Sequence, residues 1–309
     1  MKKIIFLFVL LLMCFSTCDI SRTCGHVQFI TPEGEIQVVF SVTSDMRKYS
    51  GCNANYFRGV CETIACGGPG KFMVTPGDVD PPGNVYYTIK AYIGEEYVWY
   101  PAAGNHDAAS SSVMSWLRNF NANGNSLPNI VNVGPPGCEE TTYSFDYGDA
   151  HFVILNEYYD GKNDYGKDGD VVDALYNWLI NDLASNTRPI AFVFGHEPAY
   201  PQPDEESGRL RHGSDSLNAY PFNRDRFWNA LVNYGVAAYI CGNTPNHSAI
   251  NIDGVWQIDA GHARGTADKG ARSTFIMFYV MVNGNVWYYT YRLDLETNEY
   301  VLTGNGQLM

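Results

Sequence analysis

The chain has 309 residues, of which 45% are hydrophobic, so it can bury the core of one large domain or two small ones. Its formal net charge of −13 is spread along the sequence without a run of Lys or Arg, which argues against nucleic-acid binding because a polyanion would be repelled. No stretch of about 18 apolar residues follows the N-terminal segment, so no transmembrane helix is expected.

The N-terminal segment, residues 1–23, has the layout of a secretory signal peptide. Two lysines precede a compact apolar block, and small residues follow it in MKKIIFLFVLLLMCFSTC. We therefore expect an exported protein that is secreted, periplasmic or held at the cell surface, with residues 24–309 forming a single domain. The FSTC ending at Cys18 resembles a bacterial lipoprotein cleavage box, although Phe15 fits it poorly, so a lipid anchor is an open alternative.

The cysteines beyond the signal region favour disulfides, since an oxidising compartment allows thiols to pair. Cys52, Cys61 and Cys66 lie close enough in sequence to cross-link a Gly-rich loop, and the sequence leaves their pairing open. A zinc knuckle is the alternative for this cluster, but it lacks the CxxC spacing typical of such sites. The full set after the signal region is Cys24, Cys52, Cys61, Cys66, Cys138 and Cys241.

Short apolar runs rich in Val, Ile, Phe and Tyr predict buried strands, because each run has strand length and stops at a polar turn. With the turns that end them, the runs span residues 38–45, 71–78, 97–107, 151–161, 189–198, 237–243 and 255–265.

Helical patterns lie between these runs. Residues 170–186 carry apolar side chains at spacings of three and four, which share one face of a helix. Residues 223–235 begin at Asn223, a suitable N-cap, and stop at Gly235. Strands that alternate with helices predict an α/β fold. The apolar face of the first helix consists of Leu175, Trp178, Leu179 and Leu183.

Polar residues at the ends of the predicted strands are candidates for one shared site. In open α/β sheets the loops at the carboxyl ends of strands gather around the ligand. Asp, Asn and Gly also end strands simply because they suit turns, which explains any one position better than the whole series. The residues concerned are Asp45, Asp78, Asn105, His106, His196, Asn243 and His262.

These residues fall in short motifs with a consistent order. The motifs are Ser44-Asp45-Met46-Arg47, Gly77-Asp78, Gly104-Asn105-His106-Asp107, Gly195-His196 and Gly242-Asn243-Thr244-Pro245. From about residue 38 to residue 262, the chain resembles the calcineurin-like metallophosphoesterases and, more distantly, the purple acid phosphatases. That family carries the motifs D-x-H, G-D, G-N-H-D/E, G-H and G-H-x-H around two metal ions. The resemblance implies a sandwich of two mixed β-sheets flanked by helices.

The resemblance also implies a reaction, in which water activated by a metal attacks the phosphorus of a small phosphate ester. Asp78 would bridge two cations, and His106 would protonate the leaving group. Asp107 would orient the His106 imidazole, or would instead stabilise the turn. The cofactors would be one or two divalent or trivalent ions per chain, such as Mn, Fe, Zn or Mg. Protein partners are not indicated.

Two motifs depart from the family pattern. Arg47 stands where D-x-H supplies a histidine, and a guanidinium cannot ligate a metal, although it could bind a phosphoryl group. Asn243 and Pro245 replace both histidines of G-H-x-H. The first metal would therefore keep only Asp45 and Asp78. The second would keep Asp78, Asn105 and His196, with the Asn243 amide oxygen as a weaker substitute for imidazole.

Further candidates lie outside the motifs. His247 could act as a ligand because it follows Pro245 by two residues, an exposed loop histidine being the alternative, and His262 is another candidate ligand. Arg211 and His212 are candidates for binding phosphate oxygens. Two hypotheses follow: an active exported phosphoesterase, or a catalytically impaired relative that binds a phosphate ester or a partner protein.

Overall fold

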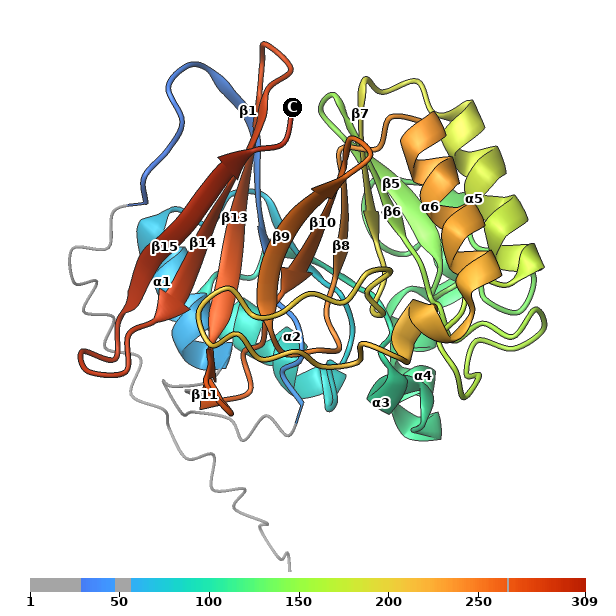
Figure 1. Ribbon diagram of the computed structural model, residues 1–309, viewed down its shortest axis with the longest axis horizontal. Coiled ribbons are helices and arrows are strands. Elements are labelled where there is room, and N and C mark those ends of the chain that lie inside the picture. Colours follow the sequence, from blue (N-terminus) through green and yellow to red (C-terminus); the bar gives the residue numbers. More distant parts are fainter. Residues whose placement is uncertain (1–28, 48–56, 266) are drawn as a thin grey trace, which may run out of the picture.

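The computed structural model describes residues 29–47, 57–265 and 267–309 (Figure 1). The predicted signal peptide, Cys24 and Cys52 lie outside these residues. Within the described part of the chain, no helix is long and apolar enough to cross a membrane. Cys61, Cys138 and Cys241 are buried free thiols. Disulfide pairing that involves Cys24, Cys52 or Cys66 stays a prediction.

Two large sheets form the centre of the molecule, and a two-stranded hairpin, β11 (Ala267–Asp268) with β12 (Ala271–Arg272), lies apart from them. The first sheet has the order β15 (Tyr300–Gln307), β14 (Val286–Leu293), β13 (Thr274–Met281), β1 (Ile36–Val42), β2 (Phe72–Thr75) and β3 (Val98–Pro101). The second has the order β4 (Ile130–Val133), β5 (Tyr143–Tyr147), β6 (Ala150–Ile154), β7 (Ile190–Phe194), β8 (Ala238–Cys241), β10 (Val255–Ala260) and β9 (His247–Ile252).

Both sheets are mixed, with a parallel core and antiparallel flanks. Strands β1, β2 and β3 are parallel, as are β6, β7, β8 and β10, whereas β13 to β15, β4, β5 and β9 pair antiparallel. Each apolar run in the sequence corresponds to one of the parallel strands, so the predicted strands are confirmed.

Helices cover the outer faces of both sheets (Figure 1). On the first sheet, α1 (Phe57–Gly67), α2 (Pro82–Tyr92) and α4 (Ser111–Phe120) bury their apolar faces against Met73, Trp99 and Met277. On the second, α5 (Asp173–Ser185) and α6 (Pro221–Asn233) pack on Val153 and Val193. The short helices are α3 (Asn105–Ala108), η1 (Ala122–Gly124) and η2 (Ser216–Ala219). The predicted two-sheet sandwich flanked by helices is confirmed.

The two helices predicted in detail are present, with one correction. Leu175, Leu179 and Leu183 are buried as predicted, and α6 is followed by Gly235 at φ 62°. Asn223 is not the N-cap: α6 begins at Pro221, whose fixed φ suits the first helical position. The Asn223 side chain instead donates a hydrogen bond to Asp170.

A layer of phenylalanines joins the two sheets. Phe40 of β1 stacks on Phe278 with ring centroids 4.8 Å apart, and it contacts Phe152 of the second sheet edge-on at 5.2 Å. Pairs of this geometry are each worth about 0.5–1.5 kcal/mol beyond the area they bury. This packing holds the carboxyl ends of the parallel strands of both sheets at one edge of the sandwich. Within each sheet, neighbouring loops are joined at this edge by a backbone hydrogen bond. Asp45 N–H donates to Gly77 O at 3.3 Å in the first sheet, and Gly242 N–H donates to His196 O at 3.0 Å in the second.

Candidate metal centre

Three side chains that follow different parallel strands converge at this edge. Asp45 follows β1, Asp78 follows β2 and His196 follows β7, and each offers a ligand atom within 4.8 Å of the others. All three are buried, with 1%, 2% and 0% of their surface exposed. A buried group of two carboxylates and one imidazole has excess negative charge, which a cation would balance.

Close backbone approach makes this convergence possible. A Cβ at Gly104 would lie 2.3 Å from the Asp78 nitrogen and 2.5 Å from its Oδ1, so any side chain there would displace the carboxylate. Asp45 and Asp78 have φ values of 51° and 56°, in the left-handed region that Asp and Asn tolerate better than most residues. The glycine of GNHD is therefore explained by contact with the site.

His196 is oriented as a metal-binding histidine would be. Its Nδ1 lies 2.6 Å from the Pro76 carbonyl oxygen, to which it donates. Its Nε2 is buried without a hydrogen-bond partner among the described residues and lies 3.6 Å from Asp78 Oδ1. Burial alone would lower the pKa of His196, but the charges of Asp78 and Asp45 raise it to about 9. A metal would displace the proton from Nε2, as histidine ligation requires.

The pKa of Asp78 is also shifted from its usual value. Burial first, and then the neighbouring Asp45 charge, raise its pKa well above the usual range, while His196 acts in the opposite direction. Its Oδ1 accepts the backbone N–H of His106 at 3.0 Å. Burial is thus the main cause of the raised pKa of Asp78.

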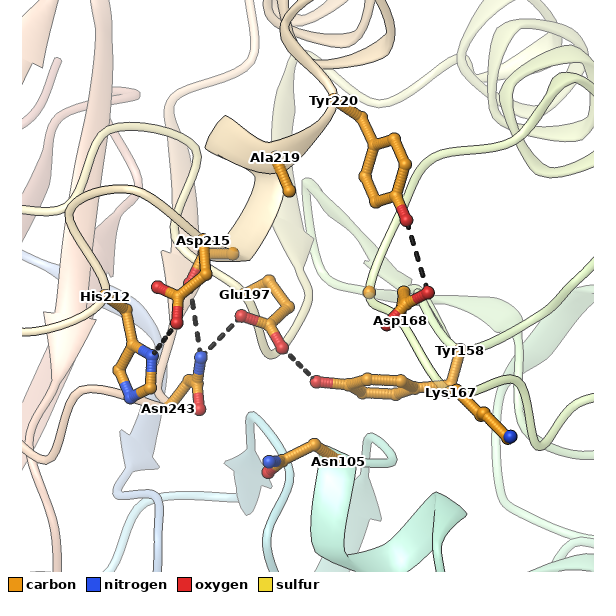
Figure 2. A pocket seen from close by; sticks show the side chains of 12 residues that line it. Asn105, Tyr158, Lys167, Asp168, Glu197, His212, Asp215, Ala219, Tyr220 and Asn243 are labelled. Atoms are coloured by element: carbon orange, nitrogen blue, oxygen red, sulfur yellow. Dashed lines mark hydrogen bonds and ion pairs between the residues drawn. The ribbon is translucent and has the colours of Figure 1, made fainter.

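Two asparagine amides lie beside this cluster. Asn105 Oδ1 is buried and has no hydrogen-bond partner in the described part of the chain. The Asn243 nitrogen donates to Glu197 Oε2 and to Ser216 Oγ, the latter at 3.2 Å. Figure 2 shows the Asn243 nitrogen turned toward Glu197 and its oxygen turned away. Each amide therefore has an oxygen available to a cation.

Two glutamates that sequence reasoning did not select support this arrangement. Glu197, in GHEP, accepts hydrogen bonds from Asn243 and from the Tyr158 hydroxyl. Glu157, after β6, accepts the backbone N–H groups of His196 at 2.7 Å and of Glu197 at 2.6 Å. Burial raises the pKa of Glu157 to about 7. The sequence signal for both was an acidic residue in the polar turn that ends a predicted strand.

His106 and Asp107 lie in α3 with different surroundings. His106 is half-buried, and burial together with the Arg47 and His196 charges lowers its pKa to about 4. Asp107 is fully buried, and its carboxylate accepts the backbone N–H groups of Gly104 at 2.9 Å and Val79 at 3.1 Å. These contacts correspond to the turn-stabilising alternative for Asp107, since no described contact joins it to the His106 ring.

His247 and His262 do not join the cluster. His247 Nδ1 lies 2.9 Å from the Asp259 carbonyl oxygen and its Nε2 lies 3.0 Å from Thr290 Oγ1. His262 Nε2 donates to the Ala271 carbonyl oxygen at 2.9 Å, and its Nδ1 accepts the Arg264 N–H at 3.3 Å. Neither ring has a free nitrogen to offer a metal, and His247 is buried in β9 instead of exposed in a loop.

A cavity of about 180 Å³ adjoins the centre, with Asn105 and Asn243 on its wall (Figure 2). His212 lines it and lies 3.1 Å from Asp215, whereas Arg211 is not part of the wall and lies 3.8 Å from Asp268. The other lining residues include Tyr158, Lys167, Asp168, Glu197 and Tyr220. The wall of the cavity thus carries charged side chains of both signs.

Arg47 lies beside Oδ2 of Asp78, whereas His196 lies beside Oδ1. Its Nε is 3.8 Å from Asp78 Oδ2 and 3.8 Å from Asp80 Oδ1, and 21% of its side chain is exposed. Its predicted role in binding a phosphoryl group stays a prediction.

Comparison with known proteins gives a consistent classification. A family model for calcineurin-like phosphoesterases matches residues 40–246, more than half of the chain. The structure resembles PhoD, with a TM-score of 0.59 and 13% identity over 89% of this chain and 70% of that one. It also resembles GAP50, described as the anchor in the inner membrane complex of Plasmodium, with a TM-score of 0.56 and 14% identity over 88% and 89%. Sequence identities this low indicate a shared fold and nothing further. No curated protein matches the chain.

Proposed function

We propose that this chain, which belongs to the calcineurin-like phosphoesterase family, is an exported, metal-dependent hydrolase of small phosphate esters. The observation that carries this proposal is the buried, unpartnered Nε2 of His196 beside Asp45 and Asp78. A buried polar atom without a partner is unfavourable unless a ligand satisfies it. The predicted signal peptide supports export.

The donor set fits a divalent ion. Asp45, Asp78 and His196 would hold it, with the amide oxygens of Asn105 and Asn243 beside them. A ligand set of one imidazole and several oxygen donors suits Mn²⁺, Mg²⁺ or Fe, and it differs from the thiolate ligands of a zinc site built from cysteines. Such an ion supplies Lewis acidity toward a phosphoryl oxygen and lowers the pKa of a water molecule.

The residues of the chain would bind and protonate the ester. His106 is half-buried in α3, directly after Asn105, and we assign it the protonation of the leaving oxygen. Burial and the Arg47 charge lower its pKa, and a bound phosphoryl anion would raise it again. The leaving group would occupy the cavity of about 180 Å³, whose Tyr158, Lys167 and Asp168 favour a small polar group.

Turnover of phosphate monoesters and diesters by the purified protein with added Mn²⁺ tests the proposal. The matched variant is Asp78→Asn, which keeps the shape of the side chain and removes its charge. We expect turnover in the wild type and at least a hundredfold lower kcat in the variant, because the Asp78 carboxylate would be a charged ligand of the ion. Absence of turnover in the wild type with every ester and metal, in a folded preparation, would contradict the proposal.

A second candidate is a relative that keeps the fold and binds a partner protein. The observation in its favour is the replacement of both histidines of G-H-x-H by Asn243 and Pro245. GAP50, which resembles this structure, is described as an anchor. The variant Asn243→His with Pro245→His separates the two: turnover that appears only in the variant favours the binding protein, whereas similar turnover in both favours the hydrolase.

A further inference from the structure

The two oxygens of Asp78 face different basic side chains. Oδ1 lies 3.6 Å from His196 Nε2 and also accepts the His106 N–H. Oδ2 lies 3.8 Å from Arg47 Nε. A carboxylate that bridges two cations also has one cation beside each oxygen. Arg47 therefore lies where a second cation would contact Asp78.

The Arg47 side chain is also largely buried, with 21% of it exposed. Its Nε is buried and has no hydrogen-bond partner within the described ranges, and it lies midway between Asp78 and Asp80 at 3.8 Å from each. The guanidinium is therefore a charged component of the centre.

In the described part of the chain, the carboxylates nearest this position already face Arg47 or accept a hydrogen bond. Of the carboxylates described near it, Asp78 and Asp80 both face the Arg47 guanidinium, and one Asp45 oxygen accepts the Asn243 N–H at 3.0 Å. A guanidinium has no lone pair to offer, and it repels a divalent ion. His247 and His262 use both of their ring nitrogens elsewhere.

We propose that the centre takes a single divalent ion, held by Asp45, Asp78 and His196, and that the Arg47 guanidinium replaces the second cation and binds the phosphoryl group of an anionic ligand. The proposal rests on the metal centre of the proposed function and specifies its composition. A planar guanidinium suits this role because it can donate two parallel hydrogen bonds to phosphate oxygens.

Metal content tests the first part of the proposal, the single divalent ion. Wild type, Arg47→His and Arg47→Lys are equilibrated with Mn²⁺, freed of loose ions by gel filtration and measured by elemental mass spectrometry. We expect one ion per chain in the wild type, two in Arg47→His, which gains a ligand, and one in Arg47→Lys, which keeps the charge without a ligand. Circular dichroism verifies that each variant is folded.

The outcomes separate this inference from the proposed function. Two ions in the wild type, or one in a folded Arg47→His, would overturn the single-ion centre and leave the hydrolase proposal standing. No ion in the wild type would overturn the metal centre and both proposals with it.

Binding of inorganic phosphate tests the second half. Calorimetry on the Mn²⁺-loaded protein compares the wild type with Arg47→Met, which preserves most of the side-chain length. We expect a Kd for phosphate that is roughly 10- to 100-fold higher in the variant, the range of a charged hydrogen bond. The matched control is Arg188→Met, a change of an exposed arginine that pairs with Asp146. An unchanged Kd in Arg47→Met would overturn the phosphate-binding role.

Discussion

The amide nitrogen of Asn243 donates to the Glu197 carboxylate, and this contact decides which atom of the amide can meet a cation. A free asparagine presents nitrogen and oxygen equally, whereas here the nitrogen is engaged by an anion. An amide oxygen can thus stand where the family has an imidazole. Glu197 is itself held by the Tyr158 hydroxyl, so the orientation rests on a network of buried groups.

Glu197→Ala should weaken the binding of Mn²⁺ by roughly 10- to 100-fold, because residues that orient ligands affect metal affinity to that extent. Calorimetric titration of the metal-free protein with Mn²⁺ measures the change. Glu33→Ala, at an exposed position outside the site, is the control and should keep the wild-type affinity. Equal affinities in all three proteins would show that Glu197 does not orient a ligand.

Gly104→Ala should disrupt the centre, since the new Cβ would lie 2.3 Å from the Asp78 nitrogen and 2.9 Å from the His196 ring. We expect a loss of about 1–3 kcal/mol in the free energy of unfolding, as for overpacked cores. Urea denaturation measures it. Gly304→Ala in β15 is the matched control, because its Cβ would meet only Thr290 at 3.9 Å. A loss of similar size in both variants would refute the explanation by close approach.

His106→Asn should lower kcat by roughly 10²- to 10⁴-fold for an alkyl phosphate, the contribution of a general acid. An aryl ester with a low-pKa leaving group needs less protonation and should lose much less. Steady-state kinetics with both esters measures the contrast, and Mn²⁺ content should stay at the wild-type value. An equal loss for both esters would argue against proton donation by His106.

His151 gives the protein a pH-dependent contribution to stability away from the centre. Its ring lies 2.8 Å from Asp146 through Nδ1 and 2.8 Å from Asp182 through Nε2. Burial alone would lower the pKa of His151, but the two carboxylates raise it above its usual value. The charged form is therefore favoured on folding, and its contribution is fully present below about pH 6.5 and lost as pH rises through the folded pKa.

His151→Gln should destabilise the protein by about 3 kcal/mol at pH 6, because it leaves the buried Asp182 without its cationic partner. The difference from the wild type should shrink as pH rises above about 6.5. Urea denaturation between pH 6 and pH 9 measures both trends. A difference that stays constant over this range would mean that His151 is not charged in the folded protein.

The strand ends could be predicted because their signal is local. Each parallel strand is an apolar run that stops at a polar turn, so the positions of Asp45, Asp78 and His196 at strand ends follow from the sequence alone. The family resemblance added the two-sheet architecture. The prediction for Asn223 was wrong because its side chain has more than one possible hydrogen-bond partner. Asn223 lies inside α6 and donates to Asp170, and it does not cap the helix.

The sequence by itself determined the α/β fold, the order of the motifs and the two departures at Arg47 and Asn243, because periodicity and residue type act over a few neighbouring positions. Only the tertiary structure decided how the polar side chains pair. His247 bonds Thr290, 43 positions away in sequence, and Asn243 bonds Glu197, 46 positions away. Such partners meet only when sheet packing brings distant segments together, and a buried polar group takes the partner that packing provides.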